Sequence, residues 1–175
     1  MPIWYSGTVK IIGNTKPFHE WKEKKDYSNF ADTFIKVNNI GERYTKWGVK
    51  WDLARVDFVE TGDYNIFSFS FDTAWGSPIY LWKNIEEKYS VMIIEYGFEE
   101  QQVEFYKYLN GYTVKFDYYD WMKEKFNYQS NIEDEEEEED NFIEWRNNIF
   151  MDVLNEWNKT SGNFIDTNWE KVVLP

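Results

Sequence analysis

The segment Asn65-Ile66-Phe67-Ser68-Phe69-Ser70-Phe71-Asp72-Thr73 alternates apolar and polar side chains from Phe67 onward. Successive side chains of a β-strand point to opposite faces of the sheet, so this period of two predicts a strand with one apolar face. A second segment rich in strand-forming residues, Ala54–Glu60, precedes it, and Thr61-Gly62-Asp63 lies between the two. Because glycine and aspartate favour turns, the two segments predict an antiparallel hairpin.

Strand and helix patterns flank this hairpin on both sides. Before the hairpin they predict a strand at Ile3–Ile12, a helix at Lys16–Lys25, and a helix that starts after Ser28 and ends at Gly41. After the hairpin they predict a helix with Ser77 as its cap and Pro78 at its first position, and then a strand at Ser90–Gly97. This order of strand, helix, strand, strand, helix, strand is that of the split βαβ or ferredoxin-like fold.

Two further features extend this unit. Strands at Val103–Leu109 and Tyr112–Tyr119, joined by Asn110-Gly111, predict a second hairpin, and a short helix is expected at Asp120–Phe126. The predicted class is therefore α+β: a ferredoxin-like split βαβ antiparallel sheet extended by a hairpin, with C-terminal helices. The expected divisions are a domain at 1–128, an acidic flexible loop at 129–141, and an amphipathic helix with its tail at 142–175.

The expected amphipathic helix spans Asn141 to Trp157. Its apolar side chains recur at steps of 3, 4, 4 and 4 and share one face: Phe142, Trp145, Ile149, Val153 and Trp157. We expect this face to pack on the domain or on a partner, and a homodimer through the helix is one form of that contact.

Composition excludes several classes of protein. The chain has 175 residues, of which 21% are aromatic, and it has no cysteine and one histidine, His19. Disulfides, thiolate metal sites and thiol catalysis are excluded, and we expect no metal or organic cofactor. A net charge of −13 argues against direct binding of nucleic acid, which needs a basic face. No apolar stretch approaches the ~20 residues of a membrane span, and no signal peptide is recognisable, so we expect a location in the host-cell cytoplasm without membrane contact.

The negative charge is concentrated in one uninterrupted segment, here called the acidic run. It consists of Glu133, Asp134, Glu135, Glu136, Glu137, Glu138, Glu139 and Asp140. Without these 8 charges the chain has 24 acidic and 19 basic residues, a net charge of −5. Like charges at this density repel one another, so a solvated, mobile loop is expected. The run either solubilises the chain or binds a basic surface, and we choose it as the partner-binding site.

Two tryptophan motifs resemble those of a known family. Trp47-Gly48-Val49-Lys50-Trp51-Asp52 is similar to its W-G-T-K-W-D signature, and Phe71-Asp72-Thr73-Ala74-Trp75-Gly76-Ser77-Pro78 to its F-x-T-A-W-S-P-P signature. Glu95–Glu100 resembles its acidic Y-x-E-E segment, and Trp4–Gly13 its N-terminal strand. The family is the YubB-type ferredoxin-like domain of phages and plasmids. The resemblance covers about residues 3 to 119, with Gly76 and Ile79 departing from the S-P-P pattern, and it implies a fold and a mobile-element origin but no catalytic residues.

Other candidate residues have both structural and functional interpretations. We predict that Trp47, Trp51 and Trp75 are buried core residues rather than the lining of a pocket. His19 has no nucleophile motif beside it, which favours a structural role. A set of carboxylates could assemble a Mg²⁺ or Ca²⁺ site but is interpreted as a solvated acidic face: Asp52, Asp57, Asp72, Glu95, Glu99 and Glu100.

These features predict a non-enzymatic phage or plasmid protein that inhibits a basic host protein, most directly a nuclease of CRISPR or restriction defence. Carboxylates would take the places of phosphates in its nucleic-acid groove. The alternatives are an immunity protein or antitoxin that neutralises a basic toxin, and an enzyme with catalytic carboxylates. A pocket that brings Asp52, Asp72 and Glu95 together would favour the enzyme. Single-strand binding by stacking on aromatic rings is disfavoured, because the basic groove is missing.

Overall fold

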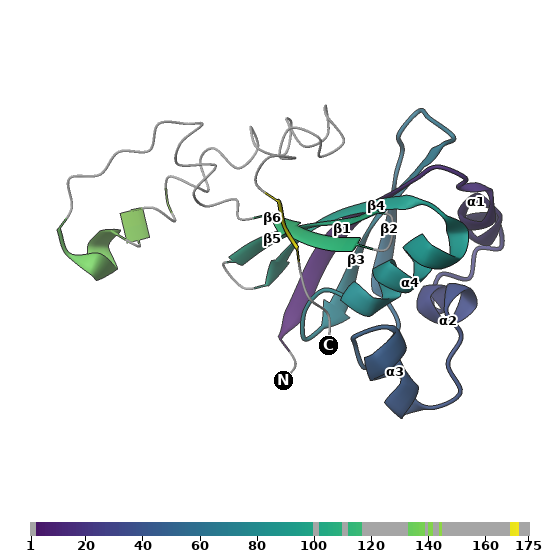
Figure 1. Cartoon of the computed structure of the whole chain (residues 1–175), viewed down its shortest axis with the longest axis horizontal. Helices are drawn as coiled ribbons and strands as arrows, with labels where there is room; N and C mark the ends of the chain where they lie inside the picture. The colour runs from purple at the N-terminus through teal and green to yellow at the C-terminus, as the bar shows by residue number, and fades with distance from the viewer. Residues whose placement is uncertain are drawn as a thin grey trace. The chain divides into compact units, whose positions relative to one another are not determined.

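The computed structural model describes residues 3–99, 102–109, 112–116, 133–138, 140–141, 144 and 169–171 (Figure 1). The chain divides into two compact units, residues 1–115 with 171–175, and residues 116–170. The predicted turn at Asn110-Gly111, the helix at Asp120–Phe126 and the apolar stripe from Phe142 to Trp157 lie outside the described residues. The predicted divisions at 128 and 141 stay predictions.

The described elements confirm an α+β protein with an antiparallel sheet. In chain order they are β1 (Trp4–Ile12), α1 (Lys16–Glu23), α2 (Phe30–Phe34), α3 (Ile40–Lys46), β2 (Ala54–Val59), β3 (Ile66–Ala74), α4 (Ile79–Tyr89), β4 (Met92–Glu99), β5 (Gln102–Leu109), β6 (Tyr112–Phe116) and β7 (Trp169–Lys171). Among these residues no helix is both long enough and apolar enough to cross a membrane.

The strand order of the sheet is β2-β3-β1-β4-β5-β6-β7. The pairs β2·β3, β3·β1, β1·β4 and β4·β5 are all antiparallel. In this register Val9 lies between Phe69 and Glu95, and Tyr5 lies between Thr73 and Glu99. The start of β1 therefore meets the ends of both β3 and β4, and the start of β2 reaches the same end of the sheet.

An aromatic core lies between one sheet face and the helices α1, α2 and α4, which Figure 1 shows together on one side of the sheet. The predicted period of two in β3 accounts for the sheet side of this core, since Phe67, Phe69 and Phe71 are all buried. Each of these rings meets a helix: Phe67 meets Phe18 at 5.9 Å, Phe69 meets Phe30 at 4.9 Å and Phe71 meets Trp82 at 5.4 Å between ring centroids.

The prediction of one helix from Ser28 to Gly41 is wrong. The chain forms two short helices there, with α2 ending at Phe34, and Gly41 lies in the first turn of α3. Asn39 caps α3 by accepting a hydrogen bond from the Glu42 N–H at 3.0 Å, and the Glu42 carboxylate accepts from the Asn38 N–H at 3.0 Å. These reciprocal bonds favour a new helix start close to Gly41.

Candidate functional site

The connection from β3 to α4 presents an exposed tryptophan in a strained conformation. We call residues Thr73–Ser77 the tryptophan loop. Trp75 is 59% exposed and has a φ of 75°, which places a bulky side chain in the left-handed region. Gly76 follows with a φ of 115°. Strained backbone persists only where its surroundings hold it, and it concentrates at binding and catalytic sites.

Three hydrogen bonds hold the tryptophan loop in place. The Trp75 N–H donates to the Ile3 carbonyl at 2.9 Å, and the Thr73 hydroxyl donates to the Gly76 carbonyl at 2.6 Å. The Ser77 hydroxyl donates to the Glu95 carboxylate at 2.7 Å. Ser77 was predicted to cap α4, but its hydroxyl makes this bond to β4 instead and α4 has no side-chain cap. The loop is therefore fastened to both β1 and β4.

Glu95, which receives the Ser77 hydrogen bond, is completely buried. Burial raises the pKa of this carboxyl to about 8, although hydrogen bonds from Ser77, Tyr5 and Tyr108 oppose part of the shift. The Tyr108 hydroxyl lies 3.5 Å from the same carboxyl oxygen, Oε2. Glu95 and both tyrosines have no exposed surface, so this carboxyl acts on the tryptophan loop through the Ser77 hydroxyl, inside the core.

The backbone of β4 is adapted to the ring of Tyr5. A Cβ atom on Gly97 would lie 2.1 Å from the Tyr5 hydroxyl oxygen, so only glycine leaves room for this ring. Burial, followed by the charge of Glu95, raises the pKa of Tyr5 well above its usual value, so this tyrosine stays protonated. The neighbourhood of Glu95 is therefore a closed, tyrosine-lined part of the core.

Two other exposed tryptophans lie at the same end of the sheet. Trp4 begins β1 and is 43% exposed, and Trp51 precedes β2 and is 41% exposed. Each has a cation of the same chain over its ring: the Arg55 guanidinium is 5.4 Å from the centroid of Trp4, and the Lys50 ammonium is 5.1 Å from that of Trp51. Such contacts are attractive because the ring face is electronegative.

Arg55 is held over Trp4 by an irregularity in β2. The β2·β3 register shifts between Ala54 and Asp57, and Arg55 has a φ of 50°. Its guanidinium pairs with Asp72, whose other carboxyl oxygen accepts from the Ser6 hydroxyl at 2.5 Å. A bulge of this kind re-aims a side chain at the edge of a sheet, and bulges are frequent near functional sites.

The prediction that Trp47, Trp51 and Trp75 are all buried is confirmed for Trp47 alone. Trp47 is 1% exposed, and its indole N–H donates to the Ile35 carbonyl at 2.7 Å. Trp51 and Trp75 are exposed, so the prediction is wrong for both. Alternation from Phe71 through Thr73 would have turned Trp75 toward the core, but β3 ends at Ala74 and the left-handed turn redirects the ring.

Asp52, the acidic member of the first motif, supplies the missing cap of α2. The N-cap residue of this helix, Asn29, makes no side-chain capping bond. The Asp52 carboxylate instead accepts the N–H groups of Ala31 at 2.7 Å, Asp32 at 2.9 Å and Leu53 at 2.8 Å. Burial raises the pKa of Asp52, and these bonds oppose part of the shift. The first motif therefore has a structural role.

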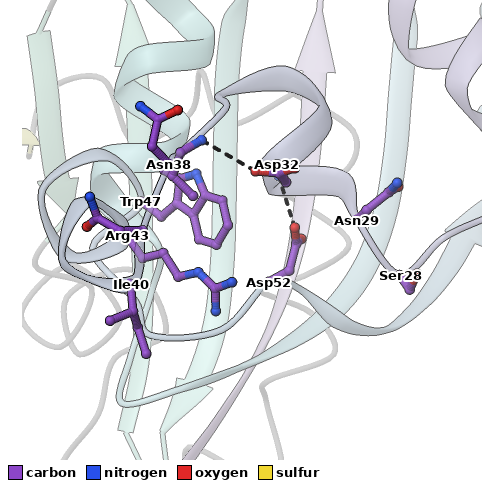
Figure 2. A pocket seen from close by; sticks show the side chains of 10 residues that line it. Ser28, Asn29, Asp32, Asn38, Ile40, Arg43, Trp47 and Asp52 are labelled. Atoms are coloured by element: carbon purple, nitrogen blue, oxygen red, sulfur yellow. Dashed lines mark hydrogen bonds between the residues drawn. The ribbon is translucent and has the colours of Figure 1, made fainter.

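A hollow of about 400 Å³ opens beside Asp52, with walls from α2 and α3. Figure 2 shows Arg43 reaching from α3 across this space toward Asp52, with the Trp47 indole next to it. One terminal nitrogen of Arg43 donates to the Lys50 carbonyl at 3.1 Å, whereas its Nε is buried and has no acceptor. Asp32 and Asp52 both line this hollow, and both carboxylates accept hydrogen bonds from backbone N–H groups.

The structure does not bring Asp52, Asp72 and Glu95 into one pocket. Asp52 binds the N-terminus of α2, and Asp72 lies opposite Ser6 on the sheet face away from Glu95. Of the other carboxylates in the predicted set, Asp57 lies in β2, where its backbone carbonyl accepts a hydrogen bond from the Ser70 hydroxyl. Glu100 lies outside the described residues. Within the described ranges no group of three or more acidic or histidine side chains could hold a metal ion.

His19 is half-buried, as predicted for a structural histidine. Its ring stacks on Tyr64 with 4.2 Å between centroids, and its Nε2 lies 2.9 Å from the Tyr64 carbonyl oxygen.

The acidic run includes a helical turn where a loop was expected. Residues 135–138 are helical, and the Asp134 carboxylate caps them by accepting from the Glu137 N–H at 3.0 Å. The side chains of Glu133 through Glu137 and of Asp140 are exposed, and that of Glu138 is partly so. Glu139 is outside the described residues. The predicted solvation of the run is confirmed for the residues described.

Comparison of the chain with family models, with curated proteins and with solved structures gives no match.

Proposed function

We propose that this chain is a non-enzymatic phage or plasmid protein that binds and inhibits a host protein with a basic surface. The partner we favour is a defence nuclease of the CRISPR or restriction type, whose groove ordinarily holds nucleic acid. The observation that carries the proposal is the acidic run, a set of solvent-exposed carboxylates on a capped helical turn. A basic toxin would meet the same surface, and the identity of the captured partner distinguishes an immunity protein from an anti-defence protein.

The distribution of charge supports an electrostatic role for the run. Residues 1–116 contain 14 basic and 16 acidic side chains, a net charge of −2. The raised pKa of Glu95 makes this part still closer to neutral. The acidic run, with 8 negative charges and no positive ones, is therefore the main source of the negative field that a basic partner would meet.

The spacing of these charges suits a groove that binds nucleic acid. An α-helix rises about 1.5 Å per residue, so a helical turn with a carboxylate at every position presents one negative charge per ~1.5 Å. Duplex DNA presents one per ~1.7 Å of its axis. A short acidic helix therefore approaches the linear charge density of DNA and can occupy cationic sites that otherwise hold phosphates.

The positions of the other carboxylates support a binding protein over an enzyme. Asp52 is bonded to three backbone N–H groups, Asp72 to Ser6 and Arg55, and Glu95 to Ser77 within the core. An enzyme with paired carboxylates needs both of them at one reacting bond. These three are committed to separate structural contacts.

We further propose that residues 3–99 have the ferredoxin-like fold that the resemblance to the YubB-type family implies. Support comes from the antiparallel neighbours β2-β3-β1-β4 and from helices in the two connections, β1 to β2 and β3 to β4. This is the arrangement expected of a split βαβ unit.

A neutralised variant tests the proposed function. In it every Glu of the acidic run becomes Gln and every Asp becomes Asn, which preserves side-chain size and an N-cap at position 134. Parent and variant are immobilised, the host protein that the parent captures from lysate is purified, and association is measured from 0.05 to 1 M salt. We expect the parent to associate about 10- to 100-fold faster at low salt, with the difference disappearing as salt screens the charges.

Equal association rates at every salt concentration would contradict the proposal. The melting temperature serves as the control and should not fall, since the change removes only repulsion between exposed like charges.

A further inference from the structure

We infer that Trp75 and Glu99 form a receptor for a lysine or arginine side chain of the partner protein. The inference rests on the proposed function in one respect, that the partner is basic. It assigns a second contact surface, at the end of the sheet where β1 begins and where β3 and β4 end.

Among the exposed tryptophans that the structure describes, Trp4, Trp51 and Trp75, only Trp75 has no described cation over its ring. Arg55 lies over Trp4 and Lys50 over Trp51. No basic side chain in the described part of the chain occupies this position at Trp75, although it is the most exposed of the three indoles. The surface therefore has two aromatic faces that its own cations occupy and one that is open to a cation from outside.

A carboxylate lies close to the backbone of the tryptophan loop. Glu99 lies opposite Tyr5 in the sheet, and Tyr5 also pairs with Thr73 at the start of the tryptophan loop. The Oε2 of Glu99 is 3.7 Å from the position of a Cβ on Gly76, the residue directly after Trp75. No basic side chain among the described residues pairs with Glu99. An exposed aromatic ring and a carboxylate that no described cation pairs with, on neighbouring backbone segments, are together complementary to an ammonium or guanidinium group.

The backbone of Trp75 gives an independent reason to assign a function to it. The left-handed conformation is unfavourable for a non-glycine residue, and an exposed tryptophan returns only part of the hydrophobic free energy of a buried one. Glycine or asparagine would adopt this φ more readily. A tryptophan held here by its own N–H bond to Ile3 and by the bond from Ser77 to Glu95 is explained by contact with another molecule.

The charges at this end of the sheet favour a protein occupant over nucleic acid. The guanidinium of Arg55 is paired with Asp72, so it contributes little attraction for phosphates. Glu99 adds a negative charge close to the tryptophan loop that no cation among the described residues pairs with, and this charge repels phosphates. Tryptophan and arginine are also the residues that most often dominate protein–protein interfaces.

The test uses the full chain with the acidic run neutralised, so that the run cannot bind the probe. The probe is the triarginine peptide acetyl-Arg-Arg-Arg-amide, titrated at 0.15 M salt while the indole N–H signals are followed by NMR. We expect the Trp75 signal, assigned by its absence from Trp75→Phe, to shift and saturate.

Trp75→Leu should weaken peptide affinity about 2- to 30-fold, the range of one cation–π contact. Glu99→Gln should weaken it about two- to fivefold.

Tyr64→Ala is the matched control, since Tyr64 is also an exposed aromatic residue, 61% exposed, but its ring stacks on His19. This variant should bind the peptide as tightly as the background chain, which is the chain with the acidic run neutralised and no other change. The melting temperatures of all variants show that they are folded. An unmoved Trp75 signal, or equal affinity of the background chain and Trp75→Leu, would overturn the inference. Because the run carries no charge in this background, such a result does not bear on the salt-dependent association of the parent, which tests the proposed function separately.

Discussion

Replacement of Trp47 by alanine is expected to lower the free energy of unfolding by about 3–5 kcal/mol, as for other large-to-small changes in cores. The ring is 1% exposed, so its removal leaves a cavity. The change also deprives the Ile35 carbonyl of the indole N–H at 2.7 Å, and a buried acceptor without a partner adds to the loss. We expect the melting temperature to fall by about 10 °C or more.

Trp51→Ala is the matched control for this prediction. Trp51 belongs to the same sequence motif but is 41% exposed, so its removal should lower the free energy of unfolding by less than half as much. Urea denaturation of the three proteins, followed by far-ultraviolet circular dichroism, measures the difference. If Trp47→Ala unfolds at the same urea concentration as the parent, the ring is not the core residue described here.

Replacement of Glu95 by glutamine is expected to stabilise the fold at high pH and to change it little at low pH. Burial raises the pKa of Glu95 from 4.5 to about 8 in the folded protein. Between these values the folded state holds a proton that the unfolded state has released. The free energy of unfolding of the parent therefore falls as pH rises through this window. The full loss is about 3–5 kcal/mol, since each pKa unit corresponds to 1.36 kcal/mol.

Glutamine keeps the size of the side chain and an oxygen for the Ser77 hydroxyl, and it does not ionise. Urea titrations at pH 5 and pH 8.5 isolate the effect, because all other carboxylates are common to both proteins. We expect similar stability at pH 5 and a variant that is about 3 kcal/mol or more stable than the parent at pH 8.5. If the free energies of unfolding of parent and variant differ by the same amount at pH 5 and at pH 8.5, Glu95 is not a buried, protonated group.

Local sequence patterns predicted most of the described sheet. The alternation of Phe67, Phe69 and Phe71 predicts β3 and its core face, and β1, β2 and β4 begin and end within about two residues of their predicted bounds. Such patterns succeed because the period of two is a property of the strand itself. The start of a separate helix at Ile40 was also readable, since Asn39 and Glu42 have the spacing of a capping box.

The features that could not be predicted depend on contacts between distant segments. Ser77 was a sound cap candidate, but its hydroxyl is taken by Glu95, 18 residues away in the sequence. Asp52 caps a helix whose first residues lie about 20 positions earlier. The predicted end of the strand at Thr73 lies one residue from the observed end at Ala74, but the exposure of Trp75 also depends on its left-handed backbone, which does not appear in the residue pattern. The sequence therefore showed the motif that forms the tryptophan loop but did not show that Trp75 is exposed.

Competition for the nucleic-acid groove of the captured host protein tests the proposed role of the acidic run most directly. A fluorescently labelled oligonucleotide is bound to that protein at 0.1 M salt, and the full chain is titrated in while anisotropy reports displacement. We expect the parent to displace the oligonucleotide, and we expect the chain with Gln and Asn throughout the acidic run to need an at least about tenfold higher concentration. Displacement by both chains at the same concentration, or formation of a ternary complex with the oligonucleotide still bound, would contradict the proposed role.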